Sequence, residues 1–145
     1  MPDNISRDNI SRHLTGNDEL DLELIDKEIQ GCYIAIISYI ILIASAKQDR
    51  LTILEESTGF TPTSTATELA ALSSYVALAS SLILGEVAFE RLNEIEKNIA
   101  SGITNASILP NIEIANGYVF SIIGNMLKVS GTVGKVKEQA NTSIL

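Results

Sequence analysis

The stretch GYVFSIIG, residues 117–124, combines apolar residues with a glycine at each end, and a third glycine follows at Gly131. Gly117, Gly124 and Gly131 are therefore seven residues apart, which places them on one face of a helix. A glycine inside a helix costs about 1 kcal/mol relative to alanine. We expect another helix to lie close along this face, where a Cβ atom would clash, and to offset that loss. A seven-residue period keeps such a seam aligned when the helices wind around each other left-handedly.

Two other stretches carry small residues at the same spacing. Gly31, Ser38 and Ser45 are seven residues apart, and so are Ser74, Ser81 and Ala88. Positions 31, 74 and 117 are the first of each set, and each is 43 residues from the next. This spacing indicates either an ancient triplication of one helix or chance in a chain rich in small residues. The predicted packing residues are Gly117, Gly124 and Gly131 as the close seam, with Gly31, Ser38, Ser74 and Ser81 facing it.

The chain is expected to be all-α: a bundle of three long antiparallel helices that forms one domain over residues 18–145. Its short links favour antiparallel neighbours, and sequence signals for helix starts and ends set the boundaries. The start signals are Asn17 or Asp18, a capping box at residues 65–68 and Pro110; the end signals are Gly59, Pro62 and Gly102. The predicted helices cover about 18–57, 65–101 and 110–138.

Residues 1–17 form a polar segment that contains a tandem pentapeptide, DNISR-DNISR, at residues 3–12. With so few apolar residues the segment cannot support a core, so we interpret it as a flexible arm. The alternative is an arm that becomes ordered on a neighbouring subunit, with Ile5 and Ile10 as its anchors.

Each predicted helix contains a long run without charge: residues 29–46, 69–85 and 114–127, which are 18, 17 and 14 residues long. A helix of a small soluble bundle buries one stripe and exposes the rest to water. In these runs apolar side chains instead occur around most of the helix. Three helices cannot cover so much apolar surface among themselves, so either other copies of the chain or lipid must cover it.

These two explanations predict different proteins. In the first, the chain is a cytoplasmic structural subunit that assembles with itself into a ring, tube or filament. In the second, it is a small integral membrane protein with two or three transmembrane helices, since a span needs about 20 residues and small-residue seams also join membrane helices. We favour self-assembly, because the chain has few interfacial aromatic residues and its Lys and Arg residues set no clear orientation.

Composition narrows the partners further. The net charge of −8 argues against nucleic acid and against anionic lipid headgroups as ligands, so the expected partner is the chain itself. The polar first seventeen residues predict no secretory signal. Cys32 is the only cysteine and lies in an apolar run, so it is predicted to be buried and inert.

The sequence offers no catalytic arrangement. His13 is the only histidine and lies in the polar arm, where it is a poor base for a Ser-His-Asp triad. Glu86 and Glu90 are one helical turn apart and could share a metal ion, but their spacing places both on a polar stripe that we expect to face solvent. Nucleotide-binding motifs are absent. We therefore expect neither enzymatic activity nor a cofactor or metal.

The glycine seam makes a prediction about assembly. Gly124→Leu should abolish assembly or folding, because a large side chain would separate helices that lie close together. Glu90→Ala, on the polar stripe, should change little. Light scattering on the purified variants measures the difference, and a Gly124→Leu protein of wild-type mass would contradict the seam.

Overall fold

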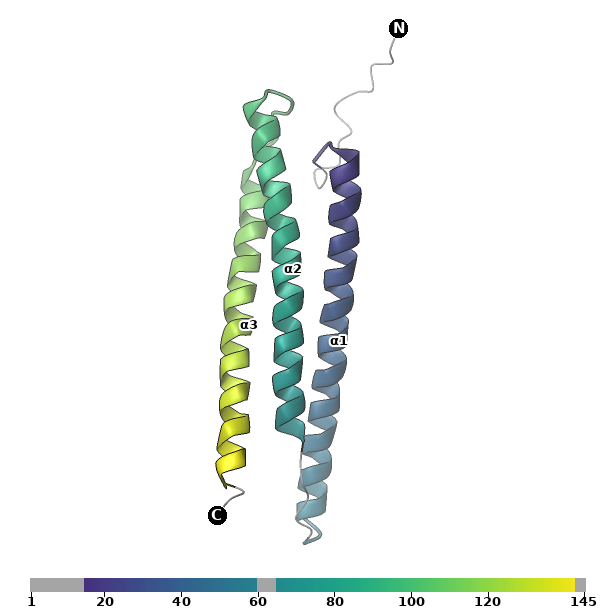
Figure 1. Ribbon diagram of the computed structural model, residues 1–145, viewed down its shortest axis with the longest axis vertical. Helices are drawn as coiled ribbons and strands as arrows, with labels where there is room; N and C mark the ends of the chain where they lie inside the picture. The colour runs from purple at the N-terminus through teal and green to yellow at the C-terminus, as the bar shows by residue number, and fades with distance from the viewer. Residues whose placement is uncertain (1–14, 60–64, 143–145) are drawn as a thin grey trace.

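A computed structural model describes residues 15–59 and 65–142 (Figure 1). It contains helices α1 (Asp18–Glu56), α2 (Ala66–Ala100) and α3 (Leu109–Thr142). Each described helix runs opposite to the one before it, so the prediction of an all-α protein with three long antiparallel helices is confirmed. The predicted boundaries differ from these by at most four residues. Ile5, Ile10, His13 and Pro62 lie outside the described residues.

Helix α2 lies between the other two helices (Figure 1). It packs against α1 on one side and against α3 on the other, whereas α1 and α3 make no direct packing contact within the described ranges. The bundle is therefore open along one side. Most of the circumference of α1, and the face of α3 turned away from α2, lack a neighbouring helix.

The start of α1 is fixed by its local sequence. The Asn17 side chain accepts the backbone N–H of Leu20, as expected of an N-cap. The Asp21 carboxylate is buried and accepts the N–H groups of Thr15, at 2.9 Å, and Gly16, at 3.2 Å. Residues 15–17, which the sequence assigned to the arm, are therefore held against the first turns of α1.

The start of α2 differs from its prediction. Thr65 is the N-cap residue, but its side chain makes no capping hydrogen bond, so the predicted capping box does not form. The reason is its backbone, with ψ near 14° instead of the extended conformation that directs a hydroxyl toward the first turn. Gly59 and Gly102, which follow the ends of α1 and α2, have φ of 84° and 69°, a region that favours glycine.

Helices α1 and α2 are joined by serine hydroxyl groups. Ser38 Oγ donates to the Ser73 carbonyl oxygen at 3.0 Å, and Ser73 Oγ donates to the Ser38 carbonyl oxygen at 2.9 Å. Two further contacts lie seven residues away on both helices: Ser45 Oγ donates to the Ala66 carbonyl oxygen at 2.7 Å, and Ser80 Oγ donates to the Gly31 carbonyl oxygen at 2.8 Å. These three contacts set the register of α1 on α2, and we call them the serine ladder.

The serine ladder requires small side chains, because a hydroxyl group on a short side chain reaches a backbone carbonyl only when the helices lie close. At Gly31 an added Cβ atom would lie 2.8 Å from the Leu84 side chain. The buried residues of the interface are accordingly mostly Ser, Ala and Gly, and Leu24 is the only large side chain that is fully buried among the described residues.

The contact between α2 and α3 also passes over a glycine. A Cβ atom on Gly85 would lie 3.2 Å from the Ile122 side chain and 3.6 Å from that of Tyr118. The Asn125 amide donates to the Ala77 carbonyl oxygen at 3.4 Å, two helical turns further along the same contact. Gly85 therefore allows close approach of α2 and α3, as Gly31 does for α1 and α2.

The two kinds of glycine predict different responses to one substitution. A Cβ atom added at Gly134 of α3 would meet nothing within 4 Å, so Gly134→Ala should raise the free energy of unfolding by about 1 kcal/mol through helix propensity. Gly31→Ala gains the same propensity but crowds Leu84, so it should leave stability unchanged or lower it. Urea unfolding followed by circular dichroism measures both, and equal stabilisation by the two substitutions would contradict the close α1–α2 contact.

Candidate functional site

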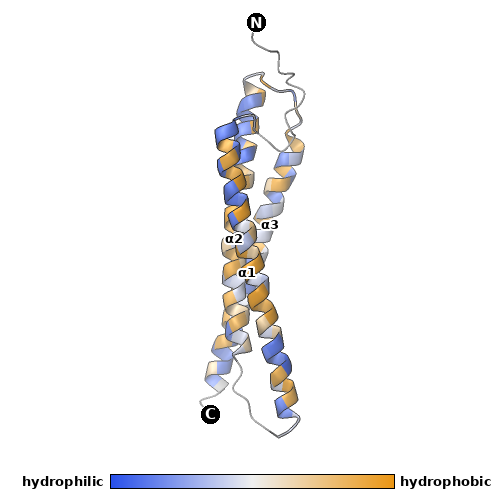
Figure 2. Ribbon diagram, turned by 90° about the vertical axis from the view of Figure 1, so that its right-hand side faces the viewer, coloured by the Kyte–Doolittle hydropathy of each residue, from blue (hydrophilic) through white to orange (hydrophobic). Residues whose placement is uncertain are grey.

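Exposed apolar side chains surround the middle of the molecule. Figure 2 shows in orange the parts of the helices that carry apolar residues. They belong to the three uncharged runs, residues 29–46, 69–85 and 114–127, and we call this surface the apolar belt. Tyr33 is 64% exposed and Phe120 is 74% exposed. Burial is thus inverted relative to a water-soluble core, because the small residues lie between the helices and the large apolar residues lie outside.

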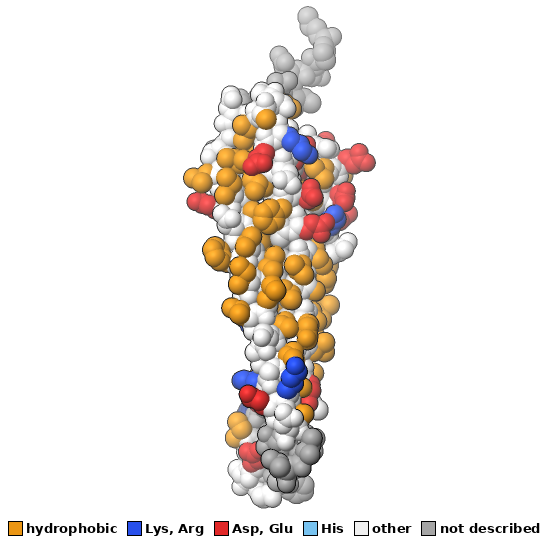
Figure 3. Space-filling view, turned by 60° about the vertical axis from the view of Figure 1, so that its left-hand side comes forward, with side chains coloured by type: hydrophobic (Ala, Val, Ile, Leu, Met, Phe, Trp, Pro, Cys, Tyr) orange, Lys and Arg blue, Asp and Glu red, His pale blue; other side chains and the backbone are white. Residues whose placement is uncertain are grey.

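Charged side chains lie mainly beyond the two ends of the apolar belt (Figure 3). Residues 18–28 of α1, 86–97 of α2 and Glu113 of α3 include eleven carboxylates and three basic side chains, a net charge of −8, and we call this region the acidic end. Residues 47–68 and 128–138, toward the other end, carry five acidic and five basic side chains. The whole net charge of the protein is therefore concentrated at one end.

Ion pairs join α1 to α2 within the acidic end. Arg91 binds Glu28 at 2.7 Å, and Lys27 binds both Glu23, at 3.1 Å, and Glu86, at 3.2 Å. The two carboxylates raise the pKa of Lys27 above its usual value, through hydrogen bonds to Glu23 and Glu86. Glu86 and Glu90 are both exposed, and no cluster of metal-binding side chains occurs among the described residues.

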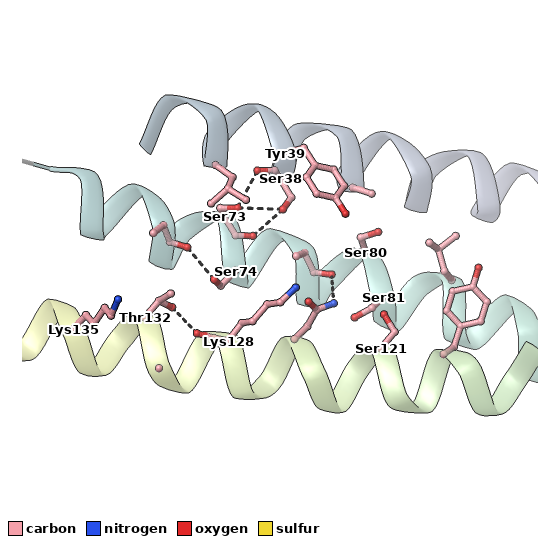
Figure 4. A pocket seen from close by; sticks show the side chains of 18 residues that line it. Ser38, Tyr39, Ser73, Ser74, Ser80, Ser81, Ser121, Lys128, Thr132 and Lys135 are labelled. Carbon is pink, nitrogen blue, oxygen red and sulfur yellow. Dashed lines mark hydrogen bonds between the residues drawn. The ribbon is translucent and has the colours of Figure 1, made fainter. Parts of the chain in front are cut away.

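A groove of about 560 Å³ runs along the open side of the bundle, with α2 as its floor and α1 and α3 as its walls (Figure 4). It extends from Tyr118 to Lys135 along α3, about 26 Å at 1.5 Å per residue. Its floor consists of small residues, namely Ala70, Ser73, Ser74, Ala77, Ser80 and Ser81. The groove is therefore as long as about 17 residues of an α-helix, and its floor consists of small side chains.

Lys128 and Lys135 lie on the α3 wall of the groove, on the side of α3 that faces α2 (Figure 4). Neither lysine forms an ion pair with any residue in the described part of the chain. Lys128 lies at the level of Ser74 of α2 and, on the opposite wall of the groove, of Ser38 of α1 (Figure 4). Ser38 is at the middle of the uncharged run of α1, so the level of Lys128 is the middle of that run, although Lys128 itself follows the last residue of the uncharged run of α3.

The glycines of α3 do not form a close contact within the chain. A Cβ atom at Gly117, Gly124 or Gly131 would meet nothing within 4 Å, because α2 packs on the neighbouring face of α3, at Tyr118 and Ile122. Gly131 borders the groove. These three glycines therefore do not form a seam between the described helices of one chain. That they form a seam between copies of the chain stays a prediction.

The residues predicted to face that seam are instead divided between the α1–α2 interface and the groove floor. Gly31 and Ser38 are buried against α2, where they belong to the serine ladder. Ser74 and Ser81 are buried on the groove floor, and their hydroxyl groups donate to carbonyl oxygens of their own helix. The α2 residues that face α1 are Ser73 and Ser80, each one position earlier in the sequence.

Four packing residues were not predicted from the sequence. Ala66, Ser73 and Ser80 form a further set at seven-residue spacing, and Gly85 interrupts an apolar stretch in α2. The sequence signal for Ser73 and Ser80 is the pair of serine doublets at 73–74 and 80–81, because the two serines of each doublet lie on adjacent faces of the helix. Spacing alone could not decide which member of each doublet faces α1.

The prediction that Cys32 is buried is wrong, since its side chain is exposed. The buried face of α1 follows Leu24, Gly31 and Ser38, and Cys32 is turned about 100° from that face. No other helix covers this side of α1 within the described residues. An apolar sequence context therefore did not imply burial inside the chain.

By length and composition alone, α1 and α2 could cross a membrane, and within the described residues α3 does not pass the same test. Only 17% of the most apolar window of α1 is buried, and 33% of that of α2, so neither is shielded as a core helix would be. No family model matches the sequence, and no curated protein or solved structure is significantly similar to it. Inferences about function therefore depend on the apolar belt, the acidic end and the groove.

Proposed function

We propose that this protein is a structural subunit that assembles with copies of itself, which cover its apolar belt. The observation that carries the proposal is the size of that belt, which surrounds the molecule with side chains such as Tyr33, Ile40 and Phe120, each at least 60% exposed. A soluble monomer rarely exposes contiguous apolar patches larger than a few hundred Å². Burial of apolar surface is worth roughly 25 cal/mol per Å², which provides a strong driving force for association.

The position of Lys128 supports sister chains over lipid as the cover. A bilayer centred on the uncharged run of α1 would place this unpaired ammonium group near its midplane, because Lys128 lies close to the level of Ser38. A lysine at the centre of a membrane helix costs about 2.5–3.5 kcal/mol on insertion scales. In a soluble assembly the same group can reach water or a carboxylate of another copy at little cost.

A small integral membrane protein remains the second candidate, because the inverted burial of this bundle favours it. Membrane helices associate through small residues and interhelical hydroxyl bonds, as α1 and α2 do at Ser38 and Ser73. In that case Lys128 would need a groove filled with water or with another helix. The two candidates share the apolar belt and differ in what covers it.

Fractionation without detergent separates the two candidates. The self-assembly proposal predicts a protein that stays in the supernatant after membranes are pelleted and elutes at a mass well above the 15.6 kDa of one chain. Recovery only from the membrane pellet with detergent would favour the second candidate. A 15.6 kDa monomer in plain buffer would contradict both.

The exposed thiol of Cys32 gives an independent measure of coverage. In the assembled protein its reaction with a maleimide should be at least about tenfold slower than after dissociation in mild denaturant that preserves helix content, because neighbouring copies cover this side of α1. Equal rates before and after dissociation would show that this side of α1 is not part of the contact.

A further inference from the structure

We propose that the groove of one copy binds the outer face of α1 of a second copy, so that four helices pack where one chain supplies three. The inference rests on the proposed self-assembly and names the two surfaces that meet. One surface is the groove floor row, Ala70, Ser74, Ala77 and Ser81. The other is the outer stripe of α1, Leu22, Asp26, Ile29 and Tyr33.

The outer stripe is a helix face that no other helix of the described chain covers. Leu22 is 66% exposed, Ile29 is 47% exposed and Tyr33 is 64% exposed. These positions lie two residues from the buried positions Leu24 and Gly31, which is about 160° around the helix. The stripe therefore points away from α2, and no other described helix packs on it.

The outer stripe and the floor row have the same spacing and opposite sizes. The positions of the stripe advance by four, three and four residues, and so do those of the floor row. Large side chains of one helix pack best over small residues of its neighbour, because the backbones can then approach without leaving cavities. When the incoming α1 runs parallel to α2, Leu22 aligns with Ala70, Asp26 with Ser74 and Tyr33 with Ser81.

Charge selects the same alignment independently. Glu19 and Asp26 are exposed on α1, seven residues apart, and Lys128 and Lys135 are seven residues apart on α3. None of the four forms an ion pair with a described residue of its own chain. An α1 helix antiparallel to α3 pairs Asp26 with Lys128 and Glu19 with Lys135. The floor alignment already places Asp26 at Ser74, and Lys128 lines the groove at the level of Ser74 (Figure 4).

The contact joins two different surfaces, so it can continue from copy to copy. Each molecule offers one groove and one outer stripe, and such a heterologous contact gives a ring when the rotation closes and a filament when it does not. Charge also favours one relative orientation of neighbouring copies. The carboxylates of the contact come from the acidic end of one copy, and the lysines come from the opposite half of the other.

Reciprocal charge reversal tests the contact in the full-length chain. We expect the K128E/K135E variant and the E19K/D26K variant each to assemble roughly tenfold or more weakly than wild type, because two attractions become repulsions. A 1:1 mixture of the two should recover wild-type mass by light scattering, since each variant's groove then meets a complementary stripe. The quadruple variant should recover it alone. The matched control R50E/K137E reverses two exposed basic residues outside both surfaces and should assemble as wild type.

The outcomes separate this contact from the proposed function. Circular dichroism should first show that each variant keeps its helix content. If wild type is large and K128E/K135E stays equally large, the groove is not an interface, although self-assembly stands. If both double variants dissociate and neither the mixture nor the quadruple variant recovers, the two surfaces do not bind each other. A monomeric wild type overturns the proposed function together with this contact.

Discussion

The serine ladder between α1 and α2 is the interaction on which the rest of the structure depends. Each hydroxyl-to-carbonyl bond is worth only about 0.5–1.5 kcal/mol net, but the bonds form only when the two helices lie close together in one register. Close approach excludes large side chains from the interface. The residues that would fill the core of an ordinary soluble bundle are therefore directed outward, where they form the apolar belt.

This arrangement leaves a single chain poorly matched to water. Its buried side chains are mainly Ala, Ser and Gly, whereas Ile, Leu, Tyr and Phe remain exposed around its middle. Because α1 and α3 do not pack on each other in the described residues, α2 keeps a floor of small residues with no helix above it. The apolar belt and the groove both arise because small residues form the contacts between the helices. Association of copies would cover the belt and fill the groove.

Charge has a separate role in such a molecule. With all of its net charge at one end, the protein presents unlike surfaces along its length. In the proposed assembly, copies that run in opposite directions would keep their acidic ends apart. The ion pairs Arg91–Glu28 and Lys27–Glu86 join α1 to α2 there. They contribute little stability where solvent reaches them, and their geometry is compatible with the register that the serine ladder sets.

The sequence alone determined the three helices, their boundaries to within a few residues, their antiparallel order and the excess of apolar surface. These features follow from local signals, such as Asn17 and Gly102, and from composition, which every part of the chain carries with it. Only the tertiary structure decided which small residues meet. Ser73 and Ser74 are neighbours in the sequence but point about 100° apart, so the path of α2 between its partners assigns one to α1 and the other to the groove. For the same reason the glycines of α3 border open space and Cys32 is exposed, since a periodic pattern defines a face of a helix but not the neighbour that covers it.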